Sequence, residues 1–475
     1  MWSSRNGDGY IALTCHFINP DFKMCCHNLQ THHFPGTHNH TTIAQALNTA
    51  AKEWCISFDK QLVAFTTDSG SNIVKALEDM DVLRLACAGH TLNLAVQKAL
   101  QIPQVSTPLA RCRELVSYFH KSRVDSDEFK KNQLMFSDIP KHKLIHDVAT
   151  RWNSTYDMIE RVCEQQLPIS SVLLQRRDSL MHLELLPNEW RILEDVVKLL
   201  RPFKIATQHL SGEEYPTIST LGPLLHEIQI KIAFQDDDSV AIKAFKKALQ
   251  DDMDSRYTDP NIKFLMYKSS FLDPRFKTLT HLSSTAKQEI FDWVLEDILN
   301  LNNGNESNDV QIECVTTTES SEPSTSSNSD CNGPTRKKKK KSALMELIGD
   351  KFQSENEQTT DTTTFKDIVH SELLRYKTEP SISVDHPPLH WWSVRRLLYP
   401  NVSKLARKYL CVVATFVPSE QLFSTAGNVV SVKRAALLPE NVEKLIFLHD
   451  NLPPVSLPYR RCVQDEACDC DSCNA

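Results

Sequence analysis

Strand-like and helical patterns divide the sequence unevenly, and this division most limits the folds open to the chain. Strand patterns crowd into residues 8–90, where "YIALTCHFI" (10–18) alternates and "FKMCCHNLQT" follows as its hairpin partner. From about residue 91 apolar residues recur at helical spacing as far as about residue 300. We therefore expect a mixed α/β sheet near the N-terminus with a large helical part attached.

Charge and cysteine usage narrow the class of protein. The 475 residues exceed one ordinary core and carry a net charge of −7, so only a local patch can bind nucleic acid. Residues 385–461 are such a segment, with ten Lys or Arg against five Asp or Glu. The fourteen cysteines show no disulfide framework and indicate reduced thiols of a nuclear or cytosolic protein. We expect no membrane partner, because no apolar run is long enough to span a bilayer.

Asp68 stands where the apolar stretch "LVAFTT" ends and "SGSN" opens a helical pattern. "LVAFTT" is apolar on both faces, which predicts a central strand covered on both sides. One interpretation of Asp68 is a helix cap that accepts a backbone N–H two or three residues on. The other is a metal carboxylate, since ligands bind at strand ends in open α/β sheets. Asp68 alone does not decide between them.

Five segments together carry a family resemblance that covers Trp2 to about Leu452. They are "TTDSGSN", "CAGHTLNL", "DVATRWNSTYDMIERV", "SSFLDPRFK" and the long stretch that begins "HWWSVRRLLYPNVSKLARKYL". Their order resembles the hAT transposase superfamily, above all the transposase-derived zinc-finger BED-domain proteins. The BED finger itself is not in this sequence.

The resemblance implies a fold of α/β plus all-α class. It implies a truncated RNase-H-like core, a large helical insertion, and a C-terminal helical region for dimerisation. We expect the N-terminal part of the core at 1–110, the helical insertion at 111–300, a disordered linker with a basic run at 301–342, linking helices at 343–384, the dimerisation region that completes the core at 385–455, and a cysteine-containing tail at 456–475.

The resemblance also implies an Asp-Asp-Glu triad that binds Mg²⁺ or Mn²⁺ and cuts DNA. Asp68 matches the second Asp, and Glu420 in "PSEQLFSTAG" matches the Glu, although Gln421 stands where the family has Arg. The first Asp would precede Trp2 by two positions and so lies outside the sequence. With one carboxylate absent, we expect no transposase activity from the chain as given.

Further matches suggest DNA contacts. Cys87 and His90 match the family's C-x-x-H, which implies His90 near the scissile phosphate with Cys87 supporting it. Half a zinc site or a helix cap is the alternative. Arg151 and Trp152 match an "RW" motif whose aromatic stacks on a rotated base, while a core aromatic on an amphipathic helix is the alternative. Arg395 and Arg396, in the basic C-terminal segment, are added as DNA-contact candidates.

Self-association is expected through the C-terminal segment. Adjacent tryptophans on a helix point about 100° apart, so one is expected inside and the other outside. The alternative is that the two apolar helix faces of this segment close the core of the single chain. The candidate dimerisation residues are Trp391, Trp392, Leu405, Tyr409, Val412, Leu445 and Ile446.

Basic and cysteine-rich runs complete the expectations. The basic run Arg336, Lys337, Lys338, Lys339, Lys340 and Lys341 predicts a nuclear localisation signal, with a solvated charge run as the alternative. Cysteines and histidines gather at 25–40 and again in "CDCDSC", but zinc is not expected in either. We expect a domesticated or degenerate transposase-like nuclear protein, a homodimer on double-stranded DNA without a small-molecule substrate. An active transposase and a pure dimerisation module are the alternatives.

Overall fold

A three-stranded antiparallel sheet opens the chain, and it contains the hairpin that the alternating pattern predicts. The single mixed sheet expected from the sequence is wrong for the described residues, because the parallel strands near Asp68 form a sheet of their own. The structure, a computed structural model, describes residues 1–3, 8–303, 364–429 and 437–452. Strands β2 (Gly9–Ile18) and β3 (Met24–His33) form the expected hairpin, with a register shift between Leu13 and Thr14. The short β1 (Trp2–Ser3) pairs with the other edge of β2 at Tyr10 and Gly9.

A separate parallel pair carries the Asp68 segment. Strand β4 (Phe65–Thr67) pairs with β5 (Arg84–Ala86), and the short helix α2 (Phe58–Gln61) precedes β4. The strand is shorter than "LVAFTT", and its three residues are only half-buried. The expectation of a strand covered on both faces is therefore wrong, because a cavity runs beside β4.

Helices cover both faces of the antiparallel sheet. Ile11 and Leu13 face α1 (His40–Glu53) and α3 (Ser71–Asp79), whereas the alternate residues Tyr10 and Ala12 face α19 (Val417–Val429) and α20 (Pro439–Asn451). This is the two-layer burial that the period of a strand requires. Asn39, rather than a threonine, caps α1, and its Oδ1 accepts the Thr42 N–H at 2.9 Å.

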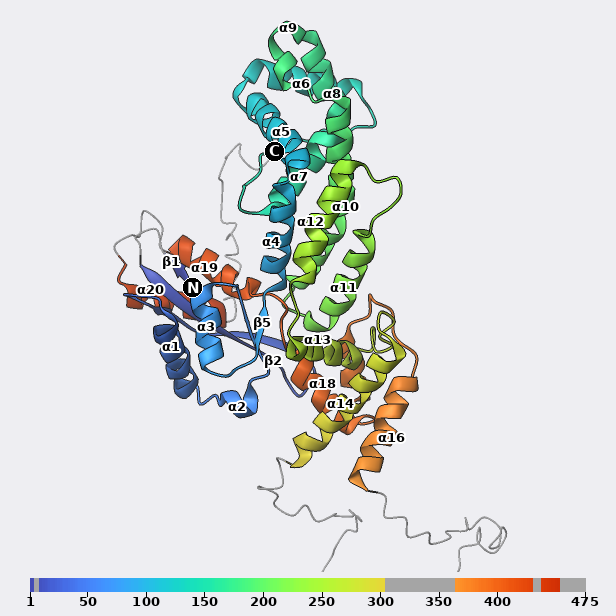
Figure 1. Cartoon of the computed structure of the whole chain (residues 1–475). Helices are drawn as coiled ribbons and strands as arrows, with labels where there is room; N and C mark the ends of the chain where they lie inside the picture. The colour runs from blue at the N-terminus through green and yellow to red at the C-terminus, as the bar shows by residue number, and fades with distance from the viewer. Residues whose placement is uncertain (4–7, 304–363, 430–436, 453–475) are drawn as a thin grey trace, which may run out of the picture.

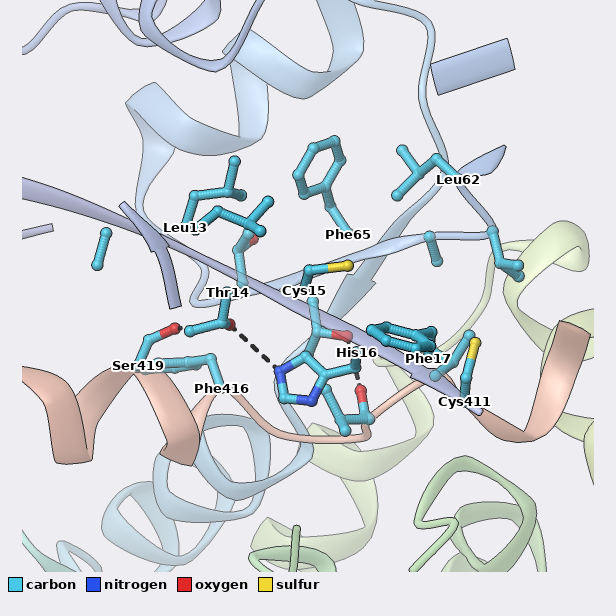
Figure 2. Close-up of a pocket in the computed structure, with 18 of the residues that line it drawn as sticks. Leu13, Thr14, Cys15, His16, Phe17, Leu62, Phe65, Cys411, Phe416 and Ser419 are labelled. Carbon is cyan, nitrogen blue, oxygen red and sulfur yellow. Dashed lines mark hydrogen bonds between the residues drawn. The ribbon is translucent and has the colours of Figure 1, made fainter. Parts of the chain in front are cut away.

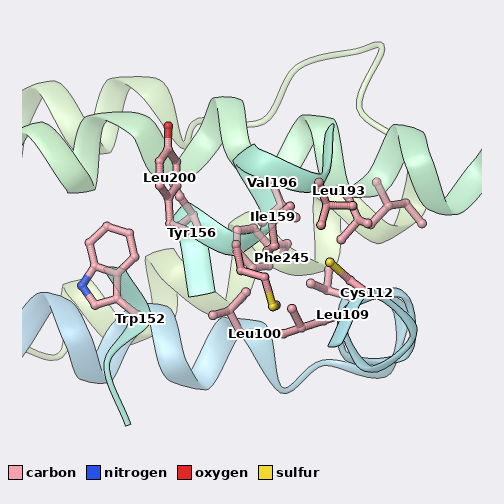
Figure 3. Close-up of a cluster of buried hydrophobic side chains, with 14 of the residues drawn as sticks. Leu100, Leu109, Cys112, Trp152, Tyr156, Ile159, Leu193, Val196, Leu200 and Phe245 are labelled. Atoms are coloured by element: carbon pink, nitrogen blue, oxygen red, sulfur yellow. The ribbon is translucent and has the colours of Figure 1, made fainter. Parts of the chain in front are cut away.

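A tall helical domain rises from the sheet (Figure 1). Its apolar faces meet in one core (Figure 3), because each long helix carries the apolar stripe seen in the sequence. Its elements are α4 (Ala88–Leu100), α5 (Pro103–Lys121), α6 (Arg123–Met135), α7 (Trp152–Glu164), α8 (Gln166–Gln175), α9 (Arg177–Leu180), η1 (Met181–Leu183), α10 (Pro187–Leu210), α11 (Ile218–Lys231) and α12 (Val240–Asp254).

A second helical cluster joins residues from both sides of the undescribed stretch 304–363. It packs α13 (Pro260–Leu272), α14 (Ser284–Asn303), α16 (Phe365–Thr378), α17 (Pro388–Arg395) and α18 (Pro400–Leu410) around a core rich in aromatic side chains. Trp391 and Trp392 are both buried in this core. The expectation that one of them faces outward is wrong, because both rings pack against Tyr376 of α16 and Tyr399, and Trp392 Nε1 also donates to the Leu272 carbonyl of α13.

The expected boundaries differ from these units. The division at 110/111 falls inside α5, whose apolar face belongs to the core of the helical domain. Residues 260–300 pack with the C-terminal helices, and within them α13 also packs on α11 of the helical domain. Most of the expected linker, including the basic run 336–341, and all of the tail 456–475 lie outside the described residues. No helix in the described ranges has the length and apolarity needed to cross a bilayer.

Candidate functional site

Asp68 lies at the C-terminal end of β4, where its carboxylate makes a local turn. Its Oδ1 accepts the Gly70 N–H at 3.0 Å. The cap position of α3 belongs to Gly70 itself, which has no side chain to bond. Asp68 therefore stabilises the turn before α3 without capping the helix. Its backbone oxygen accepts a hydrogen bond from Arg84 Nη2 at 3.3 Å, which ties it to β5.

The four-residue segment 412–415 lies between α18 and α19, the helix that carries Glu420. Hydrogen bonds attach this segment to the parallel pair and to the start of α4. The Thr66 hydroxyl donates to the Val413 carbonyl at 2.6 Å, and the Ala88 N–H donates to the Ala414 carbonyl at 2.8 Å. On its other side, the Ala414 N–H donates to Thr217 Oγ1 at 2.9 Å. These bonds hold the start of α19 beside the ends of β4 and β5.

Glu420 is the electrostatic centre of the site. The pKa of the Glu420 carboxyl is raised, mainly by partial burial, although the side chain remains solvent-accessible. Arg151 and His90 lower this pKa, and Asp68 raises it. Asp68 and Glu420 also line one cavity. The four side chains come from β4, α4, the cap of α7 and the first turn of α19. The fold thus gathers two carboxylates and two basic groups that are far apart in the sequence.

Cys87 is the cap of α4, which is one of the alternatives weighed for the C-x-x-H pair. Its Sγ accepts the His90 N–H at 3.5 Å, and burial raises the pKa of its thiol. His90 stands in the first turn of α4 and is half-buried. Sequence reasoning missed Arg84, which positions Asp68. The sequence placed Arg84 only at the start of the candidate strand "RLACAGH", and no local signal showed that this strand pairs with β4.

Trp152 does not face the site. It is 1% exposed, and its ring lies edge-on to Tyr156 and Phe203, each 6.4 Å away between ring centroids (Figure 3). The expectation of a base-stacking aromatic is corrected for this conformation, because the helical core covers both faces of the ring. Arg151, one residue earlier, is exposed and acts on Glu420.

Arg395 and Arg396 lie away from the residues that line the cavity. Arg395 Nε bonds Glu379 at 2.9 Å, and its guanidinium lies over the Trp391 ring. Arg396 donates to the Pro20 carbonyl at 3.0 Å. The structure therefore does not bring this pair together with Asp68 and Glu420.

Most candidate dimerisation residues are inside the single chain. Leu405, Val412 and Ile446 are buried in three different clusters, and Tyr409 is partly buried, with its hydroxyl donating to Asp297 at 2.7 Å. As Trp391 and Trp392 are also buried, only Leu445 of that set is exposed. The alternative that these apolar faces close the core of the chain describes this conformation.

The two carboxylates fit one metal ion better than two. Mg²⁺ is commonly held by one or two carboxylates and keeps several waters. In the described part of the chain, no group of three or more His, Cys, Asp or Glu is placed to hold a metal. The cysteines and histidines of 25–40 point to separate partners. His40, for example, bonds Asp79 at 2.8 Å, and His38 bonds the Phe34 carbonyl at 2.7 Å.

Three family descriptions match consecutive parts of the chain. The ZBED1 RNase-like domain matches residues 1–90, and the ZBED1 RNase-like helical domain matches residues 85–199. The hAT family C-terminal dimerisation region matches residues 372–452. The chain is a hAT-family, transposase-like protein. The first match covers the α/β part, the second covers the helical domain as far as α10, and the third runs from within α16 to the end of α20.

Similar proteins carry transposase and BED-finger names. The chain is 24% identical over 473 residues to the human zinc finger BED domain-containing protein 4, covering 97% of the chain and 37% of that protein. It is 26% identical over 478 residues to the putative AC transposase of maize, covering 95% of the chain and 56% of that protein. The hAT-family chain described here thus spans about a third to just over half the length of these relatives.

Proposed function

We propose that the chain is a self-associating DNA-binding protein of the nucleus, built on an RNase-H-like core, that does not cleave DNA by itself. One observation carries this proposal. Asp68, just after β4, and Glu420, on α19, line the same cavity, and the charges of Arg151, His90 and Asp68 all act on the pKa of the Glu420 carboxyl. The family resemblance predicts that Asp68, Glu420 and His90 meet, and the charges that act on Glu420 support this prediction.

The basic pair supplies the chemistry for a DNA phosphate. Arg151 is exposed at the cap of α7, and His90 lies in the first turn of α4. The N-terminus of α19 lies next to that of α4, because Ala88 is bonded to Ala414. Helix N-termini and arginine both favour anions, so this corner of the molecule suits the backbone of duplex DNA.

Asp68 and Glu420 would hold a divalent cation near that phosphate. Such an ion, when bound, neutralises charge on phosphate oxygens and lowers the pKa of a bound water. The residues' own part is to place two carboxyl groups on the wall of one cavity. Phosphoryl transfer by a two-metal clamp uses further ligands, and the described residues supply two carboxylates. This is why DNA binding without cleavage is the function proposed.

DNA binding is tested with the full chain and a labelled duplex of random sequence in fluorescence anisotropy. We expect affinity to fall steeply as salt increases, with a log–log slope that reports the phosphates neutralised. Arg151→Glu should weaken binding at every sequence and flatten this slope. The matched control is Arg123→Glu, an exposed arginine on α6 at the far end of the helical domain, which should leave binding unchanged. Absence of binding would favour the pure dimerisation module.

Cleavage is tested with Mg²⁺ or Mn²⁺ on a duplex that carries terminal repeats. We expect no strand cleavage by the chain as given. Cleavage that disappears in Glu420→Gln would overturn this part of the proposal and establish the active transposase instead. Activity that survives the substitution would come from a contaminating nuclease.

A further inference from the structure

The turn of residues 148–151 leads into α7, and its sequence gives that helix no cap of its own. Arg151 occupies the cap position, where Ser, Thr, Asp or Asn is preferred because the side chain accepts a backbone N–H of the first turn. An arginine side chain has no acceptor, and Arg151 makes no side-chain cap bond. The first N–H groups of α7 therefore need acceptors from elsewhere.

Asn93 of α4 supplies one of these acceptors. Its Oδ1 accepts the N–H of Trp152, the first residue of α7, at 3.2 Å. The turn also closes on itself, because the Ser154 hydroxyl accepts the Val148 N–H at 2.8 Å and donates to the Arg151 carbonyl at 2.7 Å. Asn93 thus does for α7 what the residue at its cap position cannot do, and the Arg151 side chain is left for another role.

Gln97, one turn further along α4, holds the other end of the turn. Its Nε2 donates to the Ala149 carbonyl at 2.9 Å. His90, Asn93 and Gln97 are spaced three and four positions apart, so they lie on one face of α4. The face of α4 that carries His90 therefore also fixes the backbone on both sides of Arg151.

The helix that carries Glu420 is attached to the sheet and to α4 by other bonds. Ser419 Oγ lies 3.4 Å from Thr14 Oγ1 of β2 (Figure 2). Segment 412–415 is hydrogen-bonded to the start of α4. Helix α4 is thus a common support for Arg151 and Glu420. Because an arginine side chain has many rotamers, a fixed backbone limits where its guanidinium reaches and lowers the entropy lost when it binds a ligand.

We propose that Asn93 and Gln97 are positioning residues for Arg151, which anchor its turn to α4 so that the guanidinium stands ready for a DNA phosphate. The inference rests on the proposed function, because a DNA phosphate is the ligand assigned there to Arg151. Neither amide needs to touch DNA, since both act through the backbone of the turn. The alternative is that the two amides only stabilise the helical domain, which predicts no effect specific to Arg151.

The test measures binding of a labelled duplex by the full chain with Asn93→Ala, Gln97→Met and both together. Alanine and methionine are good helix formers, so α4 itself should be retained. We expect the double variant to bind about 3- to 10-fold more weakly, because two hydrogen bonds to the turn are lost. Its salt slope should fall by about 1, as for the loss of one phosphate contact. The matched control is Gln104→Met, at an exposed glutamine of α5, which should leave binding unchanged.

A double-mutant cycle separates positioning from general support. In an Arg151→Ala background the same two substitutions should change affinity by less than about 2-fold, because no guanidinium remains to be positioned. An equal loss in both backgrounds would overturn the inference and leave the amides as supports of the helical domain. Unchanged binding by the double variant, with weaker binding by Arg151→Ala, would also overturn it while the proposed function stands. Absence of duplex binding by the unsubstituted chain would overturn the proposed function and this inference with it.

Discussion

Trp152 is held by its own domain rather than presented to a ligand. Its backbone N–H donates to Asn93 Oδ1 at 3.2 Å, and its ring packs among the side chains of α7 and α10. Its Nε1 is buried without a partner. A buried indole of this kind contributes mainly apolar contacts, so its role in this conformation is structural.

We expect Trp152→Ala to destabilise the protein by about 3–5 kcal/mol, because it removes a large buried ring and leaves a cavity. Urea unfolding of the full chain, followed by circular dichroism, measures this loss. Trp54→Ala is the matched control, since Trp54 is 42% exposed and should cost much less. Equal losses from both variants would contradict a core role for Trp152, as would weaker DNA binding by a stable Trp152→Phe variant.

At the scale of elements, the segment that follows α13 links neighbouring helices through buried hydrogen bonds and an ion pair. Asp273 is fully buried, receives two bonds from the Arg275 guanidinium, and accepts the Ser219 hydroxyl at 2.7 Å. Lys277 Nζ donates to the Tyr376 carbonyl at 2.7 Å. The motif "SSFLDPRFK", which carries part of the family resemblance, therefore joins α13 to α11 and α16.

We expect Arg275→Ala to destabilise the fold by about 3–5 kcal/mol, because it leaves the Asp273 charge buried without its partner. Lys198→Ala breaks an exposed ion pair with Asp195 and should change stability by less than about 0.5 kcal/mol. Chemical denaturation of both variants gives the comparison. A small loss for Arg275→Ala would mean that water reaches Asp273 and that the ion pair does not fasten the cluster.

At the scale of the whole molecule, the exposed apolar residues of the dimerisation region decide where a second copy can bind. Leu445 and Leu448 are 42% and 47% exposed and, with Leu452, follow one face of α20. An adjacent face of this helix is buried: α20 packs on β3, and Val442 and Ile446 contact Tyr10 of β2 and Leu422 of α19. An apolar stripe of this kind on the outside of a domain is typical of an interaction surface.

We expect the double variant Leu445→Asp and Leu448→Asp to convert a self-associated protein to monomer at micromolar concentration. Sedimentation velocity of the full chain measures the mass. Leu397→Asp is the control, because Leu397 is 90% exposed in the same region but lies on the second helical cluster. Dissociation by Leu397→Asp alone would place the interface there instead, and a full-length monomer before substitution would refute self-association.

The sequence by itself determined the elements whose pattern is local. Alternation identified β2, helical spacing identified the long helices, and Pro439 at the first turn marked the start of α20. Order and motif also identified the family and the two acids. These features depend on residues close together in the chain, so a single sequence carries them.

Only the tertiary structure decided what surrounds each residue. Trp152 and Trp391 carry the same local pattern whether buried or exposed, and packing from distant helices placed both inside. The meeting of Glu420 with Asp68, His90 and Arg151 depends on hydrogen bonds between segment 412–415 and the parallel strands. A cavity lies between β2 and β4, because the described ladders pair β2 mainly with β3 and β4 only with β5. Contacts between segments far apart in the chain leave no periodicity in either segment. Only the family resemblance predicted that Glu420 meets Asp68 and His90, and nothing in the sequence predicted the cavity beside β4.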